Sequence, residues 1–468
     1  MTTESTVPPT TVTVTTVSTA EDATKPSLSK ATSGSVEPLT GIPHKDEEAP
    51  MIEKLELGDG STPKDKFNTV LFIMMLHGIG SLIAWNVFIT IAPIYFQKYK
   101  LESVIPGDKP WYVTNFMNLV CLCSQLPNLT VNAIGLFVEK GNLVTRIVAS
   151  LVVVILACLF TIVFIFVNTS GWPFGFFLVT MATVIVLNCA NGFYQNSVYG
   201  LVGSFPFKYI NAVVLGNNIC GFVVTVVCIL TTEFIPNPAH NAAVYFSIAL
   251  VALVACVISF FYLRRNIFYL HQKALADQSA KDSGVFALSD YLTTFKQFWL
   301  PLVNVWAVFF VTLFIFPSVL LGIKPTNIDE EPFIPAKQYA NAIVFLNFNL
   351  FSVVGSKLAD KVQWPSPKYT WIPIFSRFAF IPLFFACNYI PDGYRSWSPL
   401  ITSELVVVIL IAIFSLSHGY YSALGMMYAP SGADPNKARI VGKMSAFILV
   451  FGIASGIAMS FLAKYVVS

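Results

Sequence analysis

Residues 145–167 read TRIVASLVVVILACLFTIVFIFV, and no charged residue follows Arg146 in this stretch. A helix needs about 20 mostly apolar residues to cross the hydrocarbon core of a bilayer. The segment therefore predicts a transmembrane helix. A backbone in lipid must satisfy its own hydrogen bonds, and continuous runs of this length are typical of helices, whereas membrane barrels show short alternating segments.

Similar apolar runs recur along the chain and predict about eleven spans. Apolar residues make up 55% of the 468 residues and charged residues only 11%, whereas a soluble domain carries about 25% charged residues. A soluble fold of this composition would expose large apolar patches. The spans are expected near residues 68–94, 112–137, 145–167, 174–203, 208–232, 242–263, 299–322, 338–359, 369–390, 399–428 and 440–466.

The chain divides into four parts. Residues 1–62 are rich in Ser, Thr and Pro without the apolar core of a signal peptide, which predicts a disordered cytosolic tail. Residues 63–263 are expected to form an N-terminal six-helix bundle, 264–298 a cytosolic connector loop, and 299–468 a C-terminal five-helix bundle. A 6+5 division is typical of two bundles that rock about a site near the membrane midplane.

Lys and Arg in the predicted loops indicate the orientation. Fourteen fall on the side of the N-terminus and six on the other side. Because positive residues concentrate in cytosolic loops, the N-terminus is expected in the cytosol. With an odd number of spans, the C-terminus is expected outside.

Localisation rests on weaker signals. The plasma membrane is the expected location. The EEAPMI sequence at 47–52 loosely resembles an acidic sorting signal, so an endolysosomal membrane is the alternative. The sequon at Asn168 falls in a short predicted outside loop and fits glycosylation.

Polar residues inside the predicted spans form stripes at helical spacing. Polar groups are costly in lipid and mostly face the bundle interior or a cavity. The stripes are Asn341, Phe345, Asn349, Ser352 and Ser356 in the eighth span, Asn188, Asn191, Gln195 and Tyr199 in the fourth, and Leu82, Trp85, Asn86 and Ile89 in the first. Together they favour a cavity for an uncharged ligand with a flat ring and several hydroxyl groups. The alternative is that each forms hydrogen bonds between packed helices.

Arg377 is the cation placed deepest within a predicted span. It is expected to face protein or water rather than lipid. Two interpretations stay open: contact with a substrate or a gate, and a structural pair with a carboxylate or with backbone carbonyls.

Motifs of enzymes, pumps and nucleic-acid binding are absent from the sequence. It contains no GxxxxGK[ST], no HExxH and no GxSxG. The eight cysteines lie in or beside apolar segments, which predicts small buried residues rather than a metal site. The sequence therefore predicts a membrane protein that is not an enzyme, has no cofactor or metal, and does not bind nucleic acid.

Several segments resemble one known family over residues 63 to the C-terminus. They are PKDKFNTVLFIMMLHGIGSLIAWNVFIT (63–90), GFYQNSVYGLVGSFPFKY (192–209), VVLGNNICGF (213–222), FNLF (348–351), SRFAFIPLFFACN (376–388) and SHGYYSALGMMYAP (417–430). In order and spacing they resemble the equilibrative nucleoside transporters.

The resemblance implies an all-α polytopic membrane protein with an MFS-like 6+5 arrangement. It also implies facilitated, sodium-independent transport of nucleosides such as uridine and adenosine by alternating access. The family's substrate-binding positions would fall on Leu82, Trp85, Ile89, Asn191, Gln195, Ser197, Phe345, Asn349, Ser352, Ser356, Arg377 and Ile453. Gln195 would contact the base, Trp85 would line the base or an outer gate, and Asn349 with its helix face would serve the ribose.

Two departures from the family pattern matter. The family's FNxxDxxGR is FNLFSVVGS at 348–356, so Ser352 and Ser356 replace an Asp and an Arg. Loss of both charges leaves neither unpaired, but removes charge assistance from ribose recognition and favours nucleobases as further substrates. Ala84 replaces a family Pro before Trp85, which would relax a helix kink.

Two alternatives to a passive carrier stay open. One is a proton-coupled nucleoside transporter of an acidic organelle, for which Glu404, His77 and His418 are the titratable candidates. The other is a membrane receptor or scaffold that transports nothing. The sequence does not predict an oligomeric state.

Overall fold

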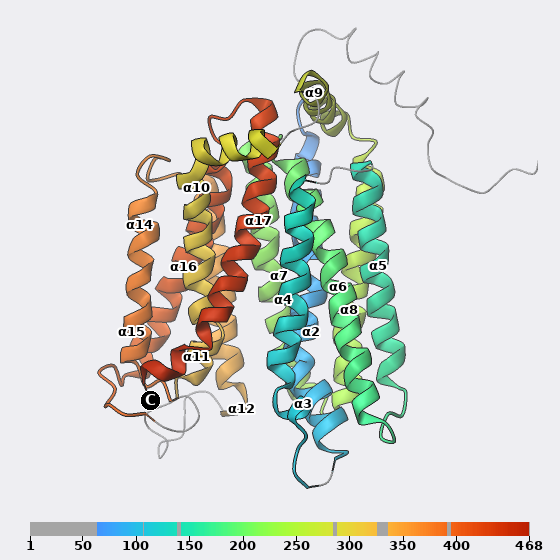
Figure 1. Ribbon diagram of the computed structural model, residues 1–468, viewed down its shortest axis with the longest axis vertical. Helices are drawn as coiled ribbons and strands as arrows, with labels where there is room; N and C mark the ends of the chain where they lie inside the picture. The colour runs from blue at the N-terminus through green and yellow to red at the C-terminus, as the bar shows by residue number, and fades with distance from the viewer. Residues whose placement is uncertain are drawn as a thin grey trace, which may run out of the picture. The chain divides into compact units, whose positions relative to one another are not determined.

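The computed structural model describes residues 63–105, 107–137, 142–283, 288–324, 336–390 and 395–467, and these form a helical bundle (Figure 1). Ten described helices are long and apolar enough to cross a membrane, and Trp371–Ala386 is a shorter apolar helix. The prediction of an all-α polytopic membrane protein with about eleven spans is therefore confirmed. The predicted tail, residues 1–62, lies outside the described residues.

The first six spans run from α2 to α8. η1 (Lys66–Asn68) leads into α2 (Thr69–Ile91), and the same span continues as the π-helical η2 (Ala92–Glu102). The others are α4 (Phe116–Phe137), preceded by α3 (Trp111–Thr114), then α5 (Leu143–Ile165), α6 (Pro173–Val202), α7 (Phe207–Phe234) and α8 (Pro238–Leu263).

The last five spans are less regular. They comprise α10 (Leu288–Ile315) with α11 (Ser318–Gly322); α12 (Ala336–Tyr339), η3 (Ala340–Leu346) and α13 (Asn347–Lys361); α14 (Trp371–Ser376), η4 (Arg377–Ala379) and α15 (Phe380–Ala386); α16 (Glu404–Tyr428); and α17 (Pro435–Ser460), followed by η6 (Ala463–Val466). The ninth span is short and has a 3₁₀ turn at Arg377, between Pro373 and Pro382.

The segment predicted as a connector loop is mostly helical. It contains α9 (Ile267–Ser283) and the beginning of α10. Phe268, Tyr269 and Leu270 of α9 are buried, and the Phe268 ring stacks on Tyr209 at the start of α7. Burial of these apolar side chains stabilises α9 as a helix in a segment whose polar composition suggested a loop.

Asn168 lies in the turn between α5 and α6. Its side chain is exposed and its Oδ1 accepts a hydrogen bond from the Ser170 backbone N–H at 3.1 Å. The sequon therefore lies at the surface, as glycosylation requires.

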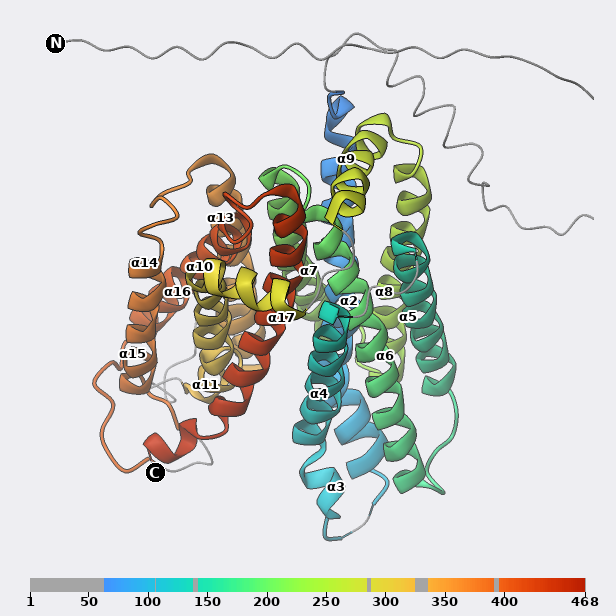
Figure 2. The ribbon, with the colours of Figure 1, turned by 45° about the horizontal axis from the view of Figure 1, so that its top comes forward.

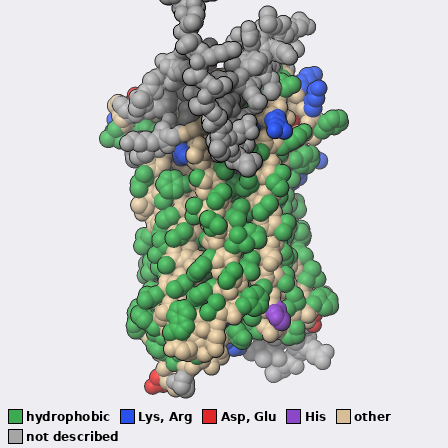
Figure 3. Space-filling model, turned by 90° about the vertical axis from the view of Figure 1, so that its right-hand side faces the viewer, with side chains coloured by type: hydrophobic (Ala, Val, Ile, Leu, Met, Phe, Trp, Pro, Cys, Tyr) green, Lys and Arg blue, Asp and Glu red, His purple; other side chains and the backbone are tan. Residues whose placement is uncertain are grey.

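Large apolar side chains are exposed on the sides of the bundle. Val163, Val251 and Leu405 are 67%, 71% and 68% exposed. Figure 3 shows one face on which hydrophobic side chains fill the middle and Lys or Arg gather near one end. Such a surface is stable only against an apolar solvent, so the chain is a multi-pass membrane protein.

The two ends of the described chain lie at opposite ends of the bundle. In Figure 1, α9 and the end of α6 lie at the top, where α2 also begins, and the C-terminus lies near the bottom. We call the end where α2 begins the inner end and the opposite end the outer end. An odd number of crossings separates the termini in this way. That the inner end faces the cytosol stays a prediction.

The two halves repeat one packing pattern. In the first half, α2 packs on α7 and α4 on α6; in the second, α10 packs on α17 and α13 on α16. In these four pairs, each helix of the second half takes the place of the helix six spans earlier. The halves meet through α4 with α17 and through α7 with α13 (Figure 2). The sequence shows no obvious repeat, yet the structure contains one.

Glycines allow the closest helix pairs to approach. A Cβ on Gly419 of α16 would lie 1.9 Å from the Ser352 carbonyl oxygen, and one on Gly355 of α13 would lie 2.2 Å from the Leu416 carbonyl oxygen. Both distances are far below van der Waals contact. The backbones of α13 and α16 therefore touch, as small residues permit in membrane bundles.

We predict that Gly419→Ala lowers the stability of the protein. The added methyl group must push α13 away from α16, and overpacking of this kind costs about 1–3 kcal/mol. Gly171→Ala is the matched control, because a Cβ there meets nothing within 4 Å. Thermal unfolding of both variants, followed by size-exclusion chromatography in detergent, checks the prediction. Equal midpoints would contradict the tight packing.

Candidate functional site

The strongest site signal is a pair of unbonded amides on α6. Asn191 and Gln195 are 4% and 3% exposed, and neither side chain hydrogen-bonds another described residue. Asn188, on the same face, instead donates to the Val184 carbonyl oxygen at 2.9 Å. Buried amides normally find partners, so Asn191 and Gln195 have hydrogen-bonding groups available for a ligand.

The next turn of α6 is fixed by bonds to its neighbours. Tyr199 Oη accepts a hydrogen bond from Asn217 Nδ2 of α7 at 2.9 Å. Asn217 Oδ1 in turn accepts from Ser81 Oγ of α2 at 2.9 Å. This chain of bonds holds α2, α6 and α7 together one turn from Gln195.

The inner end of α6 meets the second half. A Cβ on Gly203 would lie 3.3 Å from the Gly442 Cα of α17, and one on Gly200 would contact the Lys443 side chain at 3.5 Å. The predicted site residue Ser197 lies nearby but donates to the Phe193 carbonyl oxygen of its own helix at 2.7 Å. The inner end of α6 thus lies at the boundary between the halves, at Gly200 and Gly203.

A polar seam joins α7 of the first half to α13 of the second. Asn349 Nδ2 donates to Thr225 Oγ1 at 3.1 Å. One to two turns further in, Asn218 Nδ2 donates to Ser356 Oγ at 2.6 Å. The predicted residues Asn349 and Ser356 therefore lie where the two halves face each other.

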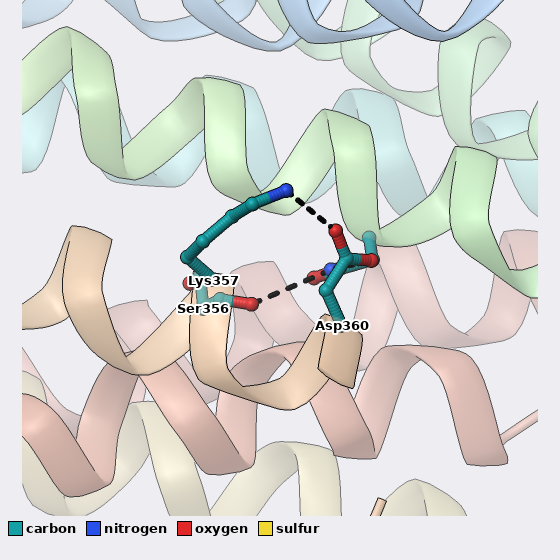
Figure 4. Close-up of polar contacts among 4 residues, drawn as sticks. Ser356, Lys357 and Asp360 are labelled. Carbon is teal, nitrogen blue, oxygen red and sulfur yellow. Dashed lines mark hydrogen bonds and ion pairs between the residues drawn. The ribbon is translucent and has the colours of Figure 1, made fainter. Parts of the chain in front are cut away.

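The same seam continues to the inner end. Asn211 Nδ2 of α7 donates to Asp360 Oδ1 at 2.8 Å and lies 3.4 Å from the Ser356 carbonyl oxygen. Lys357 Nζ pairs with the other Asp360 oxygen at 2.8 Å (Figure 4). The Asp360 carboxylate thus links the last turn of α13 to α7.

Ser352 and Ser356 do not project freely toward a cavity. Both are fully buried. Ser352 Oγ donates to the Ser415 carbonyl oxygen at 3.3 Å, and Ser356 Oγ to the Gly419 carbonyl oxygen at 3.0 Å. The hydroxyls that replace the family's charged pair are therefore bonded to α16 in this structure.

Arg377 connects three spans of the second half. Its side chain is 1% exposed. Nη1 donates to the Val308 carbonyl oxygen at 2.9 Å, Nη2 to Thr312 Oγ1 at 2.8 Å and Nε to Ser417 Oγ at 3.0 Å. Of the two interpretations of Arg377, these bonds favour a structural role, with neutral oxygen partners among the described residues.

The two histidines within spans also have partners. His77 Nδ1 lies 2.6 Å from Tyr194 Oη inside the first half. His418 Nδ1 lies 3.0 Å from Thr312 Oγ1 inside the second half, and its ring stacks on Phe348. Each histidine is buried within one half. Glu404 is the first residue of α16, at the outer end.

The other predicted site residues are partly buried apolar groups, namely Leu82, Trp85 and Ile89 on α2, Phe345 on η3 and Ile453 on α17. Trp85 stacks parallel to Phe88 at 6.3 Å between ring centroids. Asn349 Nδ2 donates to the Phe345 carbonyl oxygen at 2.9 Å. The predicted residues thus lie on α2, α6, η3, α13, η4 and α17.

Sequence reasoning missed α7. Asn217, Asn218 and Thr225 take part in the bonds described above, although α7 contributed no predicted site residue. Two adjacent asparagines within an apolar span are costly in lipid, and this signal in VVLGNNICGF could have identified them.

We predict that Arg377→Leu destabilises the protein rather than selectively reducing substrate affinity. The change removes the three hydrogen bonds that the guanidinium donates to Thr312, Ser417 and the Val308 carbonyl, and a bond to a charged group contributes about 1.5–3 kcal/mol. Arg265→Leu, at an exposed position, is the control. Thermal unfolding checks the stability. A variant of Arg377 with wild-type stability and a raised half-saturation concentration for substrate would support a binding role instead.

Comparison with known proteins gives one family. Residues 181–465 match the sequence profile described as nucleoside transporter. Equilibrative nucleoside transporter 1 of Mus musculus is 25% identical over 459 residues, covering 86% of this chain and 99% of the relative. Equilibrative nucleoside transporter 3 of Rattus norvegicus is 27% identical over 430 residues, covering 86% and 90%.

A plant relative and one solved structure extend the comparison. Equilibrative nucleotide transporter 1 of Arabidopsis thaliana is 25% identical over 420 residues, covering 85% of this chain and 87% of the relative. The crystal structure of the human organic anion transporter MFSD10 (TETRAN) matches with a TM-score of 0.52 and 12% identity, covering 86% and 95%. At this identity the structural match concerns the fold, and it agrees with an MFS-like arrangement.

Proposed function

Because this chain belongs to the nucleoside transporter family, we propose that it carries nucleosides across its membrane passively, without sodium, by alternating access of its two halves. The proposed location is the plasma membrane. No covalent chemistry is needed, since the concentration gradient alone sets the net direction.

The observation that carries the proposal is the pair of buried, unbonded amides on α6. Gln195 and Asn191 each offer a carbonyl acceptor and an NH₂ donor. The edge of a nucleobase presents donors and acceptors side by side, which a primary amide can complement. Neither amide is charged, so the site favours an uncharged solute over a nucleotide.

Apolar surface would complete the base site. Trp85 presents an indole ring on α2, and Leu82 and Ile89 lie one turn to either side of it. Stacking on an aromatic ring contributes about 1–3 kcal/mol per base in single-strand binding proteins. We propose that the base stacks against Trp85 while Gln195 reads its edge, with Ile453 of α17 and Phe345 of η3 facing it from the second half.

Ribose recognition would depend on neutral groups. Asn349 and Asn218 lie at the seam between the halves, and their amides could exchange the present bonds for bonds to sugar hydroxyls. Ser352 and Ser356 are bonded to α16 carbonyls, so they would contribute only after those bonds break. Neutral hydrogen bonds are about half as strong as charge-assisted ones. We therefore propose weaker discrimination between nucleosides and free nucleobases.

Alternating access requires contacts between the halves that can open. The seam from Asn349 to Asn211 consists largely of neutral amide and hydroxyl bonds. Such bonds between membrane helices contribute only about 0.6 kcal/mol each. Their rupture at one end and re-formation at the other would cost little net free energy, as a passive carrier needs.

The contacts of the two histidines support passive over proton-coupled transport. His77 and His418 are each bonded to a hydroxyl inside one half, and neither bond crosses between the halves. Proton coupling usually needs a titratable group on the substrate path.

We predict that Gln195→Ala reduces uptake of labelled uridine in cells that lack their own nucleoside transporters. Loss of hydrogen bonds to the base should cost about 1–3 kcal/mol, which corresponds to a roughly 5- to 150-fold loss of affinity. Surface expression should stay at the wild-type level.

Thr183→Ala is the matched control for Gln195→Ala. Thr183 is on the same helix, and its hydroxyl donates to the Val179 carbonyl oxygen at 2.8 Å. Uptake by this variant should equal that of the wild type. Wild-type uptake by Gln195→Ala would remove Gln195 from the site.

We predict that uridine, adenosine, inosine and adenine all compete for one uptake pathway. Because the ribose is recognised without charge assistance, the preference for nucleosides over adenine should be smaller than charge-assisted recognition would produce. Competition assays with and without a protonophore, at acidic and neutral pH, check this. A protonophore should leave the flux unchanged. Strong adenine uptake with weak uridine uptake would contradict a nucleoside site, and protonophore-sensitive flux would support proton coupling.

A further inference from the structure

The first part of α10 is an arm that does not cross the membrane with the rest of the helix. Phe298 has non-helical dihedrals (φ −112°, ψ 20°), and Pro301 follows within the helix. Proline removes a backbone donor and bends a helix. Residues 288–298 therefore run across the inner end of the bundle, in front of α17 (Figures 1 and 2). We call this segment, together with Trp299, the α10 arm.

Three kinds of side chain occupy three separate sectors of the arm. A helix turns about 100° per residue. The buried side chains, within about 60° of one another, are Tyr291, Thr294 and Phe298, at 6%, 2% and 7% exposure. The exposed apolar side chains, also within about 60°, are Leu288, Leu292, Phe295 and Trp299, at 60%, 56%, 39% and 53% exposure. The exposed polar side chains are Ser289, Asp290, Thr293, Lys296 and Gln297.

Two hydrogen bonds, one from the buried sector and one from the polar sector, fix the arm to both halves of the protein. Tyr291 Oη donates to the Leu136 carbonyl oxygen at the inner end of α4. On the polar side, Lys437 Nζ at the start of α17 donates to Gln297 Oε1 at 3.1 Å. The arm therefore lies across the inner end of the α4 and α17 contact, with a fixed orientation about its own axis.

Two other helices, α4 and α14, also expose large apolar side chains. On α4, Leu126 and Ile134 are 60% and 47% exposed. On α14, which contacts α10, Trp371 and Ile372 are 43% and 51% exposed. Large apolar side chains are thus exposed both on the arm and on α4, to which Tyr291 bonds.

We propose that the α10 arm is a membrane-interface helix, with Leu288, Leu292, Phe295 and Trp299 inserted at the boundary between lipid headgroups and acyl chains. One sector packs on protein, one faces lipid, and one faces water. A helix parallel to the membrane surface and packed on a transmembrane bundle needs this division. The tryptophan at the end of the arm, Trp299, fits the preference of this residue type for the membrane–water interface.

The lipid is favoured over a protein partner for a physical reason. The arm carries Lys296 on the border between its apolar and polar sectors, at about 80° from Leu288 along the helix turn. A lysine at this border can extend its ammonium group to a phosphate while its chain stays in the apolar region. The proposal concerns membrane contact and does not depend on the transported solute.

Photo-crosslinking of the full-length purified protein tests the proposal. The photoreactive residue p-benzoylphenylalanine is placed singly at Phe295 in the apolar sector, Thr293 in the polar sector and Tyr291 in the buried sector. Each protein is reconstituted in nanodiscs of phosphatidylcholine and phosphatidylserine, illuminated, and analysed by mass spectrometry. Leu126 on the lipid-facing side of α4 serves as the positive control.

We expect a phospholipid adduct at Phe295 at a level close to that at Leu126 and several-fold above that at Thr293. Tyr291 should give a link within the chain to α4. A lipid adduct at Phe295 no higher than at Thr293, with a normal adduct at Leu126, would overturn the proposal. The same experiment at Leu292 controls for a local effect of one substitution. A protein adduct at Phe295 in native membranes would indicate a protein partner instead.

Discussion

The bilayer core offers no hydrogen-bond partner, and this constraint organises the whole molecule. Every polar group within a span must bond another part of the protein, contact water or bind a solute. The Tyr199, Asn217 and Ser81 chain and the bonds of Arg377 show how most of these groups are satisfied. Against this background, the amides of Asn191 and Gln195 are two of the exceptions, because like those of Asn241 and Asn304 they are buried without a partner among the described residues.

Helix α13 contacts its own half and the other half in two different ways, by close packing at glycines and by polar bonds. Within each half, backbones touch at glycines, as at Gly355 and Gly419, and such contacts keep a half rigid. Between the halves, α7 and α13 meet mainly through amide and hydroxyl groups. Rigid halves joined by weak polar bonds form the arrangement that a rocking carrier requires.

The serines that replace the family's charged pair fit this division. A buried Asp and Arg would have needed each other and a set of further hydrogen bonds. Ser352 and Ser356 need only the α16 carbonyls that lie beside them. The two small hydroxyls thus bond α13 to α16, and in the function that we propose ribose recognition falls to neutral amides nearby.

The sequence by itself determined the class of the protein, because the length and apolar content of a span depend only on the bilayer that it must cross. It also identified the polar stripes, since their spacing follows from the helical repeat. Only the tertiary structure decided which stripe residues are bonded, because partners such as Thr225 and the Ser415 carbonyl lie on helices distant in sequence. The repeated pairing of helices in the two halves and the bend that turns the α10 arm away from its span likewise depend on packing between distant segments, which local sequence does not encode.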